Sequence, residues 1–304
     1  MESQPLPAEA RTVPRLAIAA VKALRPKQWI KNLLVYAAVV FSLQFTDLDQ
    51  LFRATVAAAA FCLVSSAGYL FNDSRDVEAD RMHPTKRNRP IASGALPVGA
   101  AYAELVLCLV VASGLAWWLS PQFLLVLGLY FATTLSYTYI FKHHVILDVM
   151  FISAGFLWRA AGGAVAVGVT LSPWLLTCTL FLTLFLGFNK RRSELLLLAG
   201  KAGEHRRNLH TYSESLLLEF QAVTTSGTII SYALYCVLGS PTPWLILTLP
   251  IALYTVFRYI YLVNDRGAGG EASDTLFQDR PLLVGVALYG AVVPMILLLA
   301  PRPV

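Results

Sequence analysis

The sequence predicts an all-α protein, a bundle of nine transmembrane helices that forms one domain. Of its 304 residues, 57% are hydrophobic and 14% are charged, and the mean hydropathy is +0.61. A soluble domain carries about 25% charged residues, so this composition indicates a membrane protein. Apolar runs that approach the ~20 residues needed to cross a bilayer recur along the whole chain. They lie near 33–46, 51–71, 98–119, 121–141, 145–168, 172–188, 216–238, 242–263 and 281–300.

The N-terminal segment comes before the first apolar run. Residues 1–14 are polar and rich in Pro and Ala, and they lack the apolar core and cleavage site of a signal peptide, so we expect a disordered tail. From Val13 to Ile30 the pattern is basic and amphipathic, which predicts a helix lying on the anionic inner leaflet. We expect residues 15–304 to form the single transmembrane domain.

The distribution of Lys and Arg predicts the orientation of the bundle. With the N-terminus inside, one side receives the N-terminal segment and the loops at 72–97, 142–144, 189–213 and 264–280. These stretches hold 20 of the 24 Lys and Arg residues, whereas Arg53 and Arg302 fall on the other side. The positive-inside rule therefore places the long loops in the cytoplasm.

Composition also excludes several function classes. The net charge of +6 follows from the loop asymmetry and does not indicate nucleic-acid binding, because there is no soluble basic domain. No Walker loop, GxGxxG or HExxH motif is present. The four cysteines stand singly in apolar runs, with no CxxC pair, and we expect reduced packing residues. They are Cys62, Cys108, Cys178 and Cys236.

An acidic motif, N-D-S-R-D-V-E-A-D, follows the second apolar run. Asp73, Asp76 and Asp80 are three and four residues apart, so on a helix their carboxylates share one face, with Asn72 close by. Three like charges on one face repel one another. A divalent cation removes this repulsion, and Mg²⁺ prefers such oxygen ligands, usually shared with substrate phosphates. The motif therefore predicts a site for a magnesium-bound diphosphate at the membrane surface.

Basic residues near this motif are suited to the remaining charge of a phosphate. Three follow the motif directly, namely Lys86, Arg87 and Arg89. Lys27, Lys31 and Asn32 lie in R-P-K-Q-W-I-K-N, before the first apolar run. This segment either anchors the chain at the interface or reaches phosphate groups.

Further charges lie at or inside the later apolar runs. Lys190 and Arg191 belong to N-K-R-R-S-E after the sixth run, which is either a stop-transfer cluster or an ordered phosphate site. Lys142 closes the fourth run and is either an ordinary residue of the membrane interface or a phosphate ligand. Asp148 and Arg159 lie in the fifth run. A charge at the bilayer centre costs about 2.5–3.5 kcal/mol, so Arg159 is expected either to face a polar cavity or to form internal hydrogen bonds.

The acidic motif and its position resemble the first Asp-rich motif of the UbiA superfamily of intramembrane prenyltransferases. The resemblance covers nearly the whole chain. Typical members carry a second D-x-x-x-D motif after the sixth helix, where this chain has N-K-R-R-S-E. They also often have Y-x-x-x-K near the fourth helix, whereas here Thr138 stands four residues before Lys142. These departures argue against the usual isoprenyl-diphosphate donor.

One branch of that superfamily, the decaprenyl-phosphate phosphoribosyltransferases of bacterial cell-wall synthesis, is similar in several segments. They are R-P-K-Q-W-I-K-N, D-V-E-A-D-R-M-H-P-T-K-R-N-R-P-I-A-S-G, G-F-N-K-R-R-S-E-L and G-E-A-S-D-T-L-F-Q-D-R. The resemblance implies transfer of 5-phosphoribose from phosphoribosyl diphosphate to a polyprenyl phosphate, such as decaprenyl phosphate, with release of diphosphate. It also implies a location in the bacterial plasma membrane, an active site that faces the cytoplasm, and a role in the synthesis of a lipid-linked arabinose precursor for the cell wall.

Residue roles follow for this reaction. We expect Mg²⁺ on Asn72, Asp73, Asp76 and Asp80, with the aspartates acting in catalysis because the metal neutralises the departing diphosphate. The residues expected to bind donor phosphates are Lys86, Arg87, Lys190 and Arg191. The candidates for holding the acceptor phosphate are Lys27, Lys31, Lys142 and Arg159.

Two other functions stay open at the level of sequence. One is a conventional UbiA-type enzyme that transfers an isoprenoid to an aromatic or other acceptor. The other is a transporter or lipid-binding membrane protein. Transporters place polar groups near the midplane, often with inverted repeats, whereas here the charges cluster at one interface and no repeat is found, which favours an enzyme. Neither prenyl chain length nor oligomeric state can be read from the sequence, and a homo-oligomer is compatible with it.

Overall fold

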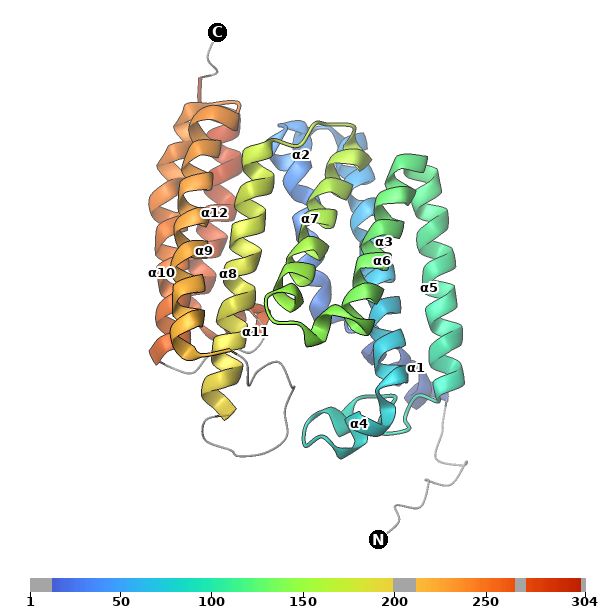
Figure 1. Ribbon diagram of the computed structural model, residues 1–304. Helices are drawn as coiled ribbons and strands as arrows, with labels where there is room; N and C mark the ends of the chain where they lie inside the picture. The colour runs from blue at the N-terminus through green and yellow to red at the C-terminus, as the bar shows by residue number, and fades with distance from the viewer. Residues whose placement is uncertain (1–12, 199–211, 266–271, 302–304) are drawn as a thin grey trace.

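The computed structural model describes residues 13–198, 212–265 and 272–301. Every regular element in these ranges is a helix, so the all-α prediction is confirmed (Figure 1). The first elements are α1 (Val13–Ala23), η2 (Pro26–Tyr36), α2 (Ala37–Phe41), η3 (Gln44–Thr46), α3 (Leu48–Arg75), α4 (Val77–Met82) and η4 (Lys86–Asn88). The next are α5 (Val98–Leu119), α6 (Pro121–Tyr139), η5 (Phe141–His143), α7 (Leu147–Val167) and α8 (Pro173–Leu198). The last are α9 (Glu214–Leu234), η7 (Tyr235–Gly239), η8 (Pro243–Thr248), α10 (Leu249–Asp265), α11 (Ala272–Gln278) and α12 (Arg280–Leu299).

Helical segments cover all nine predicted apolar ranges. Within the described ranges, six helical stretches are long and apolar enough to cross a membrane. They are α3, α5, α7, α9 with its π-helical continuation η7, η8 with α10, and α12. The prediction of a polytopic helical membrane protein therefore stands, whereas nine separate crossings are not confirmed.

The first apolar range is not the continuous span that we expected. A 3₁₀ helix, η2, runs into the five-residue α2, and the short η3 follows. This segment packs closely on α7, where a Cβ added at Gly163 would lie 2.1 Å from the carbonyl oxygen of Val35. Gly162 likewise leaves room for the ring of Phe61. The Gly162-Gly163 pair thus allows close approach, as expected for small residues between membrane helices.

The N-terminal helix is also shorter than predicted. The amphipathic pattern suggested one helix from Val13 to Ile30, but α1 ends at Ala23. Arg25 has a left-handed backbone (φ 55°, ψ 59°) and Pro26 follows it, so the chain turns and begins η2 in a new direction. Of the tail predicted at 1–14, residues 1–12 lie outside the described part of the chain, and residues 13 and 14 belong to α1.

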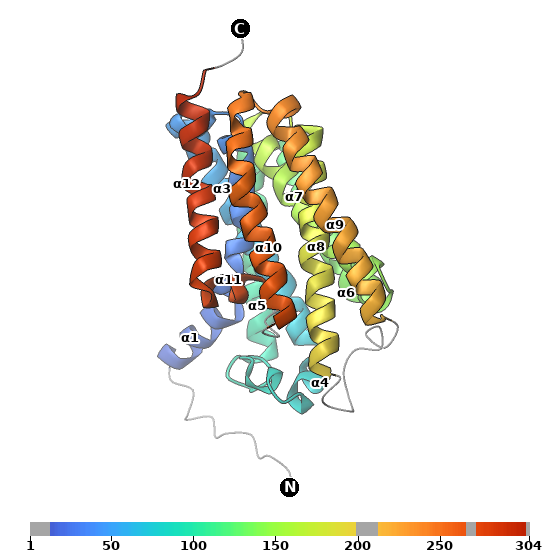
Figure 2. The same ribbon diagram turned by 90° about the vertical axis from the view of Figure 1, so that its left-hand side faces the viewer.

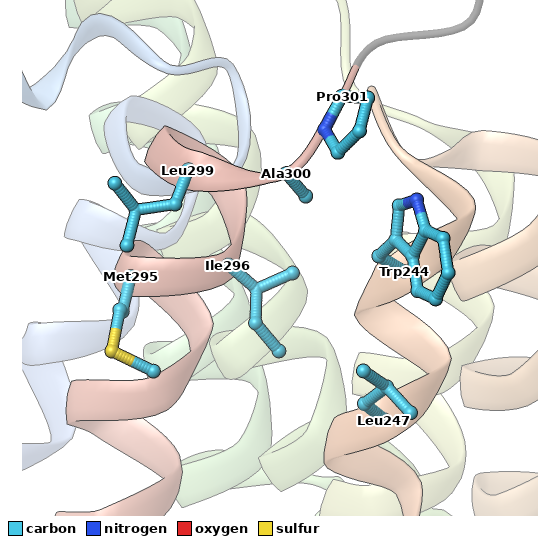
Figure 3. Close-up of a pocket in the computed structure, with 7 residues that line it drawn as sticks. All are labelled: Trp244, Leu247, Met295, Ile296, Leu299, Ala300 and Pro301. Carbon is cyan, nitrogen blue, oxygen red and sulfur yellow. The ribbon is translucent and has the colours of Figure 1, made fainter.

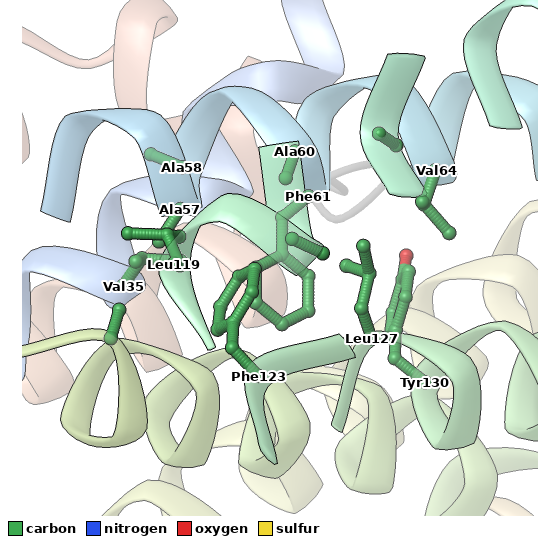
Figure 4. Packing of buried hydrophobic residues seen from close by; sticks show 13 residues of the cluster. Val35, Ala57, Ala58, Ala60, Phe61, Val64, Leu119, Phe123, Leu127 and Tyr130 are labelled. Carbon is green, nitrogen blue, oxygen red and sulfur yellow. The ribbon is translucent and has the colours of Figure 1, made fainter. Parts of the chain in front are cut away.

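The bundle has α3 at the centre of one half. Phe61 of α3 makes edge-on ring contacts with Phe123 and Tyr130 of α6, at centroid distances of 5.8 and 5.3 Å. Val35 and Leu127 belong to the same buried cluster (Figure 4). Burying each such side chain contributes about 1.5–3 kcal/mol relative to exposure in water, although the lipid environment reduces this difference for helices.

Figure 1 shows α8, α9, α10 and α12 on one side of the molecule and α3, α5 and α6 on the other, with α7 between them. The side formed by α8, α9, α10 and α12 has its own core, in which Tyr232 and Tyr235 pack with Leu245 and Leu297. The helices α1 and α4 and the C-terminal end of α8 lie at the end of the bundle opposite the C-terminus (Figures 1 and 2). The acidic motif is therefore at this end.

An apolar pocket lies at the other end of the bundle. Its volume is about 240 Å³, and it opens between η8 and the last turns of α12 (Figure 3). The residues around it are Trp244, Leu247, Met295, Ile296, Leu299, Ala300 and Pro301. Trp244 is exposed, as is common for tryptophan at a membrane interface. This pocket is remote from the acidic motif and contains no ionisable group.

Candidate active site

The acidic motif lies where α3 passes into α4. The helical path is interrupted at Asp76 (φ −91°, ψ 13°), so the prediction of one continuous helix through the motif is wrong in this detail. The hydrogen bonds from Asp76 N to Asn72 O (2.9 Å) and from Asp80 N to Asp76 O (2.8 Å) nevertheless keep the helical spacing. Asp73 and Asp80 are 4% and 3% exposed, whereas Asp76 is half-buried. Two buried carboxylates require charge partners.

Two arginines supply those partners. Arg89 Nη1 lies 3.0 Å from Asp73 Oδ1 and 2.7 Å from Asp80 Oδ2, so one guanidinium nitrogen bridges both carboxylates. Arg25 Nη2 donates to both oxygens of Asp73, at 2.7 and 2.6 Å. Arg25 follows α1, and Arg89 comes after η4. The motif thereby joins three segments into one charge-balanced cluster.

The donor set of this cluster suits a hard divalent cation. Among the described residues, no three His, Cys, Asp or Glu side chains are gathered into a ready metal cage. The Nη1 atom of Arg89 nevertheless shows that a cationic atom fits between the carboxylates of Asp73 and Asp80. Carboxylate and amide oxygens are the ligands of Mg²⁺, which is held by one or two carboxylates together with substrate phosphates. The residues therefore fit a magnesium ion that arrives with a phosphorylated substrate.

Asp76 faces a different segment. Its Oδ2 lies 3.9 Å from Nζ of Lys142, which belongs to η5 between α6 and α7. The neighbouring Arg75 guanidinium lies over the ring of Tyr139, at 4.2 Å from the centroid. The predicted site residues Asp76 and Lys142, which are far apart in the sequence, are thus close together in the fold.

A cleft of about 290 Å³ opens beside Asp73. It is lined by Lys22, Ala23, Arg25, Asp73, Thr85, Asn88, Arg89 and Pro90. We call it the Arg25 cleft. Its lining contains three cations and one carboxylate, so the cleft itself carries a net positive charge.

The end of α8 is held by a second ionic cluster. Arg191 Nε lies 2.7 Å from Asp148 Oδ2, and Arg191 Nη1 lies 2.6 Å from Glu194 Oε2. The Tyr212 hydroxyl donates to Asp148 Oδ1 at 2.9 Å and accepts from the backbone N–H of Ile146 at 2.7 Å. Burial, and to a smaller extent the charge of Asp148, raises the pKa of Tyr212, so the phenol stays protonated and can donate. The buried Arg191 side chain is therefore engaged by protein carboxylates.

Arg159 lies inside the bundle and is 5% exposed. Each of its three guanidinium nitrogens donates a hydrogen bond: Nε to Asn32 Oδ1 (2.6 Å), Nη1 to Gly155 O (2.8 Å) and Nη2 to the Tyr130 hydroxyl (2.8 Å). Asn32 in turn donates to the Cys62 sulfur at 3.1 Å. Of the two alternatives for Arg159, the structure contains the internal hydrogen bonds.

The other predicted phosphate ligands do not line the Arg25 cleft. Lys27 and Arg87 are exposed, whereas Lys31, Lys86 and Lys190 are half-buried. All four cysteines are free, in agreement with the prediction of reduced thiols. Parts of two predicted loops, Lys201, Arg206 and Arg207 in one and Gly270 and Glu271 in the other, lie outside the described residues.

Sequence reasoning missed the contributions of Lys22, Arg25 and Asp148. Arg25 opens the segment R-P-K-Q-W, and the proline after it was a signal for a turn at this point. Asp148 was recognised as a charge inside the fifth run, where a buried carboxylate needs a cation, but the sequence did not indicate which one. Lys22 carries no signal of its own, because a lysine at the end of an amphipathic helix is common.

Comparison with known proteins identifies the family. The UbiA prenyltransferase family model matches residues 33–278. The decaprenyl-phosphate phosphoribosyltransferase of Mycolicibacterium smegmatis is 35% identical over 293 residues, which cover 88% of this chain and 92% of that protein. The protein of the same name from Corynebacterium glutamicum is 37% identical over 278 residues, 88% of this chain and 83% of that protein.

The fold agrees with solved structures. A UbiA homolog from Archaeoglobus fulgidus bound to GPP and Mg²⁺ has a TM-score of 0.70 and 18% sequence identity. The match covers 92% of this chain and 99% of that chain. At this level of identity the likeness concerns the fold alone. From the family match and the curated relatives, this chain belongs to the UbiA prenyltransferase family.

Proposed function

We propose that this protein transfers 5-phosphoribose from phosphoribosyl diphosphate to decaprenyl phosphate or a related polyprenyl phosphate, releasing diphosphate. The observation that carries the proposal is the distribution of charge around the motif. Basic residues of α1, of the loop after α4 and of the last turns of α8 belong to elements that share the end of the bundle with the acidic motif (Figures 1 and 2). A donor with a diphosphate and a separate phosphate needs such a surplus of cations, whereas an isoprenyl diphosphate has a single charged end. The curated relatives of the same name support this choice.

The acidic motif would hold magnesium in this reaction. Asp73, Asp76 and Asp80, with the amide oxygen of Asn72, would be its protein ligands, and the ion would neutralise the leaving diphosphate. The Mg²⁺-bound UbiA homolog of the same fold supports the use of a divalent metal. Lys86, Arg87 and Lys190 would bind donor phosphates. The buried Arg191, which the Asp148 and Glu194 carboxylates engage, would instead keep the end of α8 in place next to Lys190.

The chemistry at the anomeric carbon needs no general base. An oxygen of the acceptor phosphate is already anionic, so it forms the new bond to the anomeric carbon directly. The bond from that carbon to the diphosphate oxygen breaks, and its electron pair leaves with the diphosphate. In-line attack of this kind inverts the configuration. Lys27, Lys31 and Lys142 are the cations proposed to hold the acceptor phosphate, since Arg159 already donates to three protein oxygens.

The orientation of the bundle fits a site that opens to the cytoplasm of a bacterial plasma membrane. The acidic motif, α1 and the loop after α4 share the end of the bundle at which the basic loops gather (Figures 1 and 2). The product would be a phosphoribosylated lipid, a precursor of lipid-linked arabinose for the cell wall.

The test uses purified protein in detergent, radiolabelled phosphoribosyl diphosphate, decaprenyl phosphate and Mg²⁺. We expect label to enter the organic phase together with a phosphate group, and EDTA to stop the transfer. A parallel reaction contains labelled geranyl diphosphate and an aromatic acceptor. Transfer from geranyl diphosphate but not from phosphoribosyl diphosphate, by folded protein, would overturn the proposal and assign prenyl transfer instead.

A further inference from the structure

The Arg25 cleft brings together cations from two segments that lie far apart in the sequence. Lys22 lies in the last turn of α1, Arg25 forms the turn after it, and Arg89 follows η4. Of the three, the sequence pattern linked only Arg89 to a phosphate, and it gave no role to Lys22 or Arg25. Thr85 and Asn88 line the same cleft and add uncharged hydrogen-bond donors. A small pocket with this lining matches the chemistry of a phosphate monoester, which accepts several charge-assisted hydrogen bonds.

The backbone at Arg25 is held in an unfavourable conformation. A non-glycine residue with φ 55° and ψ 59° lies in the left-handed region, which costs about 1–3 kcal/mol unless its surroundings impose it. Here the guanidinium packs over the ring of Tyr69, 4.8 Å from the centroid, and donates to both oxygens of Asp73. The turn thus fixes one guanidinium at the boundary between the cleft and the acidic motif. Arg89 occupies the same boundary through its bridge between Asp73 and Asp80.

These two arginines now neutralise the carboxylates that a divalent cation would also use. A metal ion on Asp73 and Asp80 would supply the positive charge in their place. Arg25 and Arg89 would then lack a full anionic partner while remaining at the edge of a cleft that also contains Lys22. A second anion in the Arg25 cleft restores the charge balance, because buried or half-buried guanidinium groups are stabilised by paired oxygens.

We infer that the Arg25 cleft binds the 5-phosphate of the phosphoribosyl donor, and that Lys22, Arg25 and Arg89 determine the choice of donor. This inference rests on the proposed function. An isoprenyl diphosphate carries no phosphate monoester apart from its diphosphate, so it leaves the cations of the cleft without an anion. Phosphoribosyl diphosphate places a diphosphate at one end and a phosphate monoester at the other, so it spans the acidic motif and the cleft together. Selectivity then comes from cations that lack their anion when the wrong donor binds.

The experiment measures binding and turnover in the full-length protein in detergent, with Mg²⁺ present. The binding probes are ribose 5-phosphate and inorganic diphosphate, and the Kd of each is measured by calorimetry. Lys22→Gln is the first variant, because Lys22 is exposed and lines the cleft without contacting the carboxylates of the motif in the structure. Arg25→Gln is the second. The control is Arg81→Gln, which removes an equal charge from α4 at a side chain that is 51% exposed and outside the cleft lining.

For Lys22→Gln we expect the Kd of ribose 5-phosphate and the donor KM to rise about tenfold, while the Kd of inorganic diphosphate stays within about twofold. The acceptor KM should stay unchanged, and Arg81→Gln should behave as the wild type. Arg25→Gln should show the same selective loss, and Lys22→Gln alone decides the matter if Arg25→Gln does not fold.

Three results would overturn the inference. Equal weakening of ribose 5-phosphate and diphosphate would show a general electrostatic effect. A rise in the KM of decaprenyl phosphate alone would assign the cleft to the acceptor phosphate. Unchanged binding of ribose 5-phosphate, in a variant that still transfers phosphoribose, would refute the assignment of the 5-phosphate to the Arg25 cleft and leave the proposed function intact. Failure of the proposed function is separate, since the wild type would then transfer no phosphoribose at all.

Discussion

Asp148 and Arg191 form a buried ion pair that joins the first turn of α7 to the last turns of α8. The Nε to Oδ2 distance is 2.7 Å, and the two side chains are 2% and 3% exposed, respectively. Tyr212 donates to the second oxygen of the same carboxylate. The pair therefore fixes the position from which Lys190, the preceding residue, approaches the polar end of the bundle. Its role in the proposed reaction is indirect, through the placement of α8.

Removing one partner of this pair should destabilise the fold strongly. We expect Asp148→Asn to lower the free energy of unfolding by up to about 3–5 kcal/mol, because the buried Arg191 charge then keeps only the Glu194 carboxylate, whose side chain is 30% exposed. The measurement is denaturant unfolding in detergent, followed by tryptophan fluorescence. Glu78→Gln is the control: it breaks the exposed pair with Arg81, where the loss should be at most about 1 kcal/mol.

The double variant Asp148→Asn/Arg191→Met separates a buried-charge effect from loss of packing. It removes the cation together with its partner, so the loss of stability should be smaller than the loss caused by Asp148→Asn alone. If the two single variants, Asp148→Asn and Arg191→Met, were strictly additive, the pair would contribute no coupling energy, and its proposed role in holding α8 would be wrong.

Much of the fold follows from local sequence properties. The long apolar runs correspond to helical segments because a helix satisfies its own backbone hydrogen bonds. Any segment that crosses a bilayer must do this. The break in the first run was not predictable in the same way. Its length and composition suited a continuous helix, but the close approach of Val35 to Gly163 of α7 depends on tertiary packing. A hydropathy pattern contains no information about such a contact.

The candidate site shows the same division. Spacing alone placed Asp73, Asp76 and Asp80 on successive turns, and the structure keeps that arrangement apart from the interruption at Asp76. The sequence spacing could not show that Arg25, 48 residues before Asp73, would neutralise this carboxylate. Pairings of this kind depend on how α1 and the loop after α4 meet, and the pattern of a single sequence leaves several cations equally suited.

Removal of one carboxylate of the proposed metal site should stop turnover without unfolding the protein. Asp76 is the best position for this test, because its substitution should disturb the fold least. Its side chain is half-buried, and its ion pair with Lys142 is long at 3.9 Å. We expect Asp76→Asn to lower kcat by at least about 100-fold, since less negative charge remains to hold the metal on the leaving diphosphate. The assay is transfer of labelled phosphoribose, with a Mg²⁺ titration of the melting temperature as an independent measure of metal binding.

The control for this variant is again Glu78→Gln, two residues away on α4 with a side chain that is 84% exposed. Its turnover and its response to Mg²⁺ should match those of the wild type. Near-normal turnover of well-folded Asp76→Asn would remove Asp76 from the proposed metal site.

Lys190 tests the assignment of the end of α8 to the donor. Lys190→Ala should raise the KM of phosphoribosyl diphosphate about tenfold or more, because one charge-assisted contact to a phosphate is lost. The KM of decaprenyl phosphate should change by less than about threefold. Initial rates with each substrate varied at saturation of the other give both constants. An unchanged donor KM would exclude this role, and a selective rise in the acceptor KM would move Lys190 to the acceptor site.

Arg159 should act as a structural residue of the membrane interior. Arg159→Lys cannot reproduce three hydrogen bonds from a planar guanidinium, so the oxygens of Asn32, Gly155 and Tyr130 compete for one ammonium group. We expect a loss of about 2–4 kcal/mol in unfolding free energy, against about 1 kcal/mol for Tyr130→Phe, which removes a single partner. Denaturant unfolding in detergent measures both values. Because the effect is on folding, the acceptor KM of the folded fraction should stay within about threefold of the wild type. A large rise in acceptor KM with unchanged stability would instead place Arg159 against the acceptor phosphate.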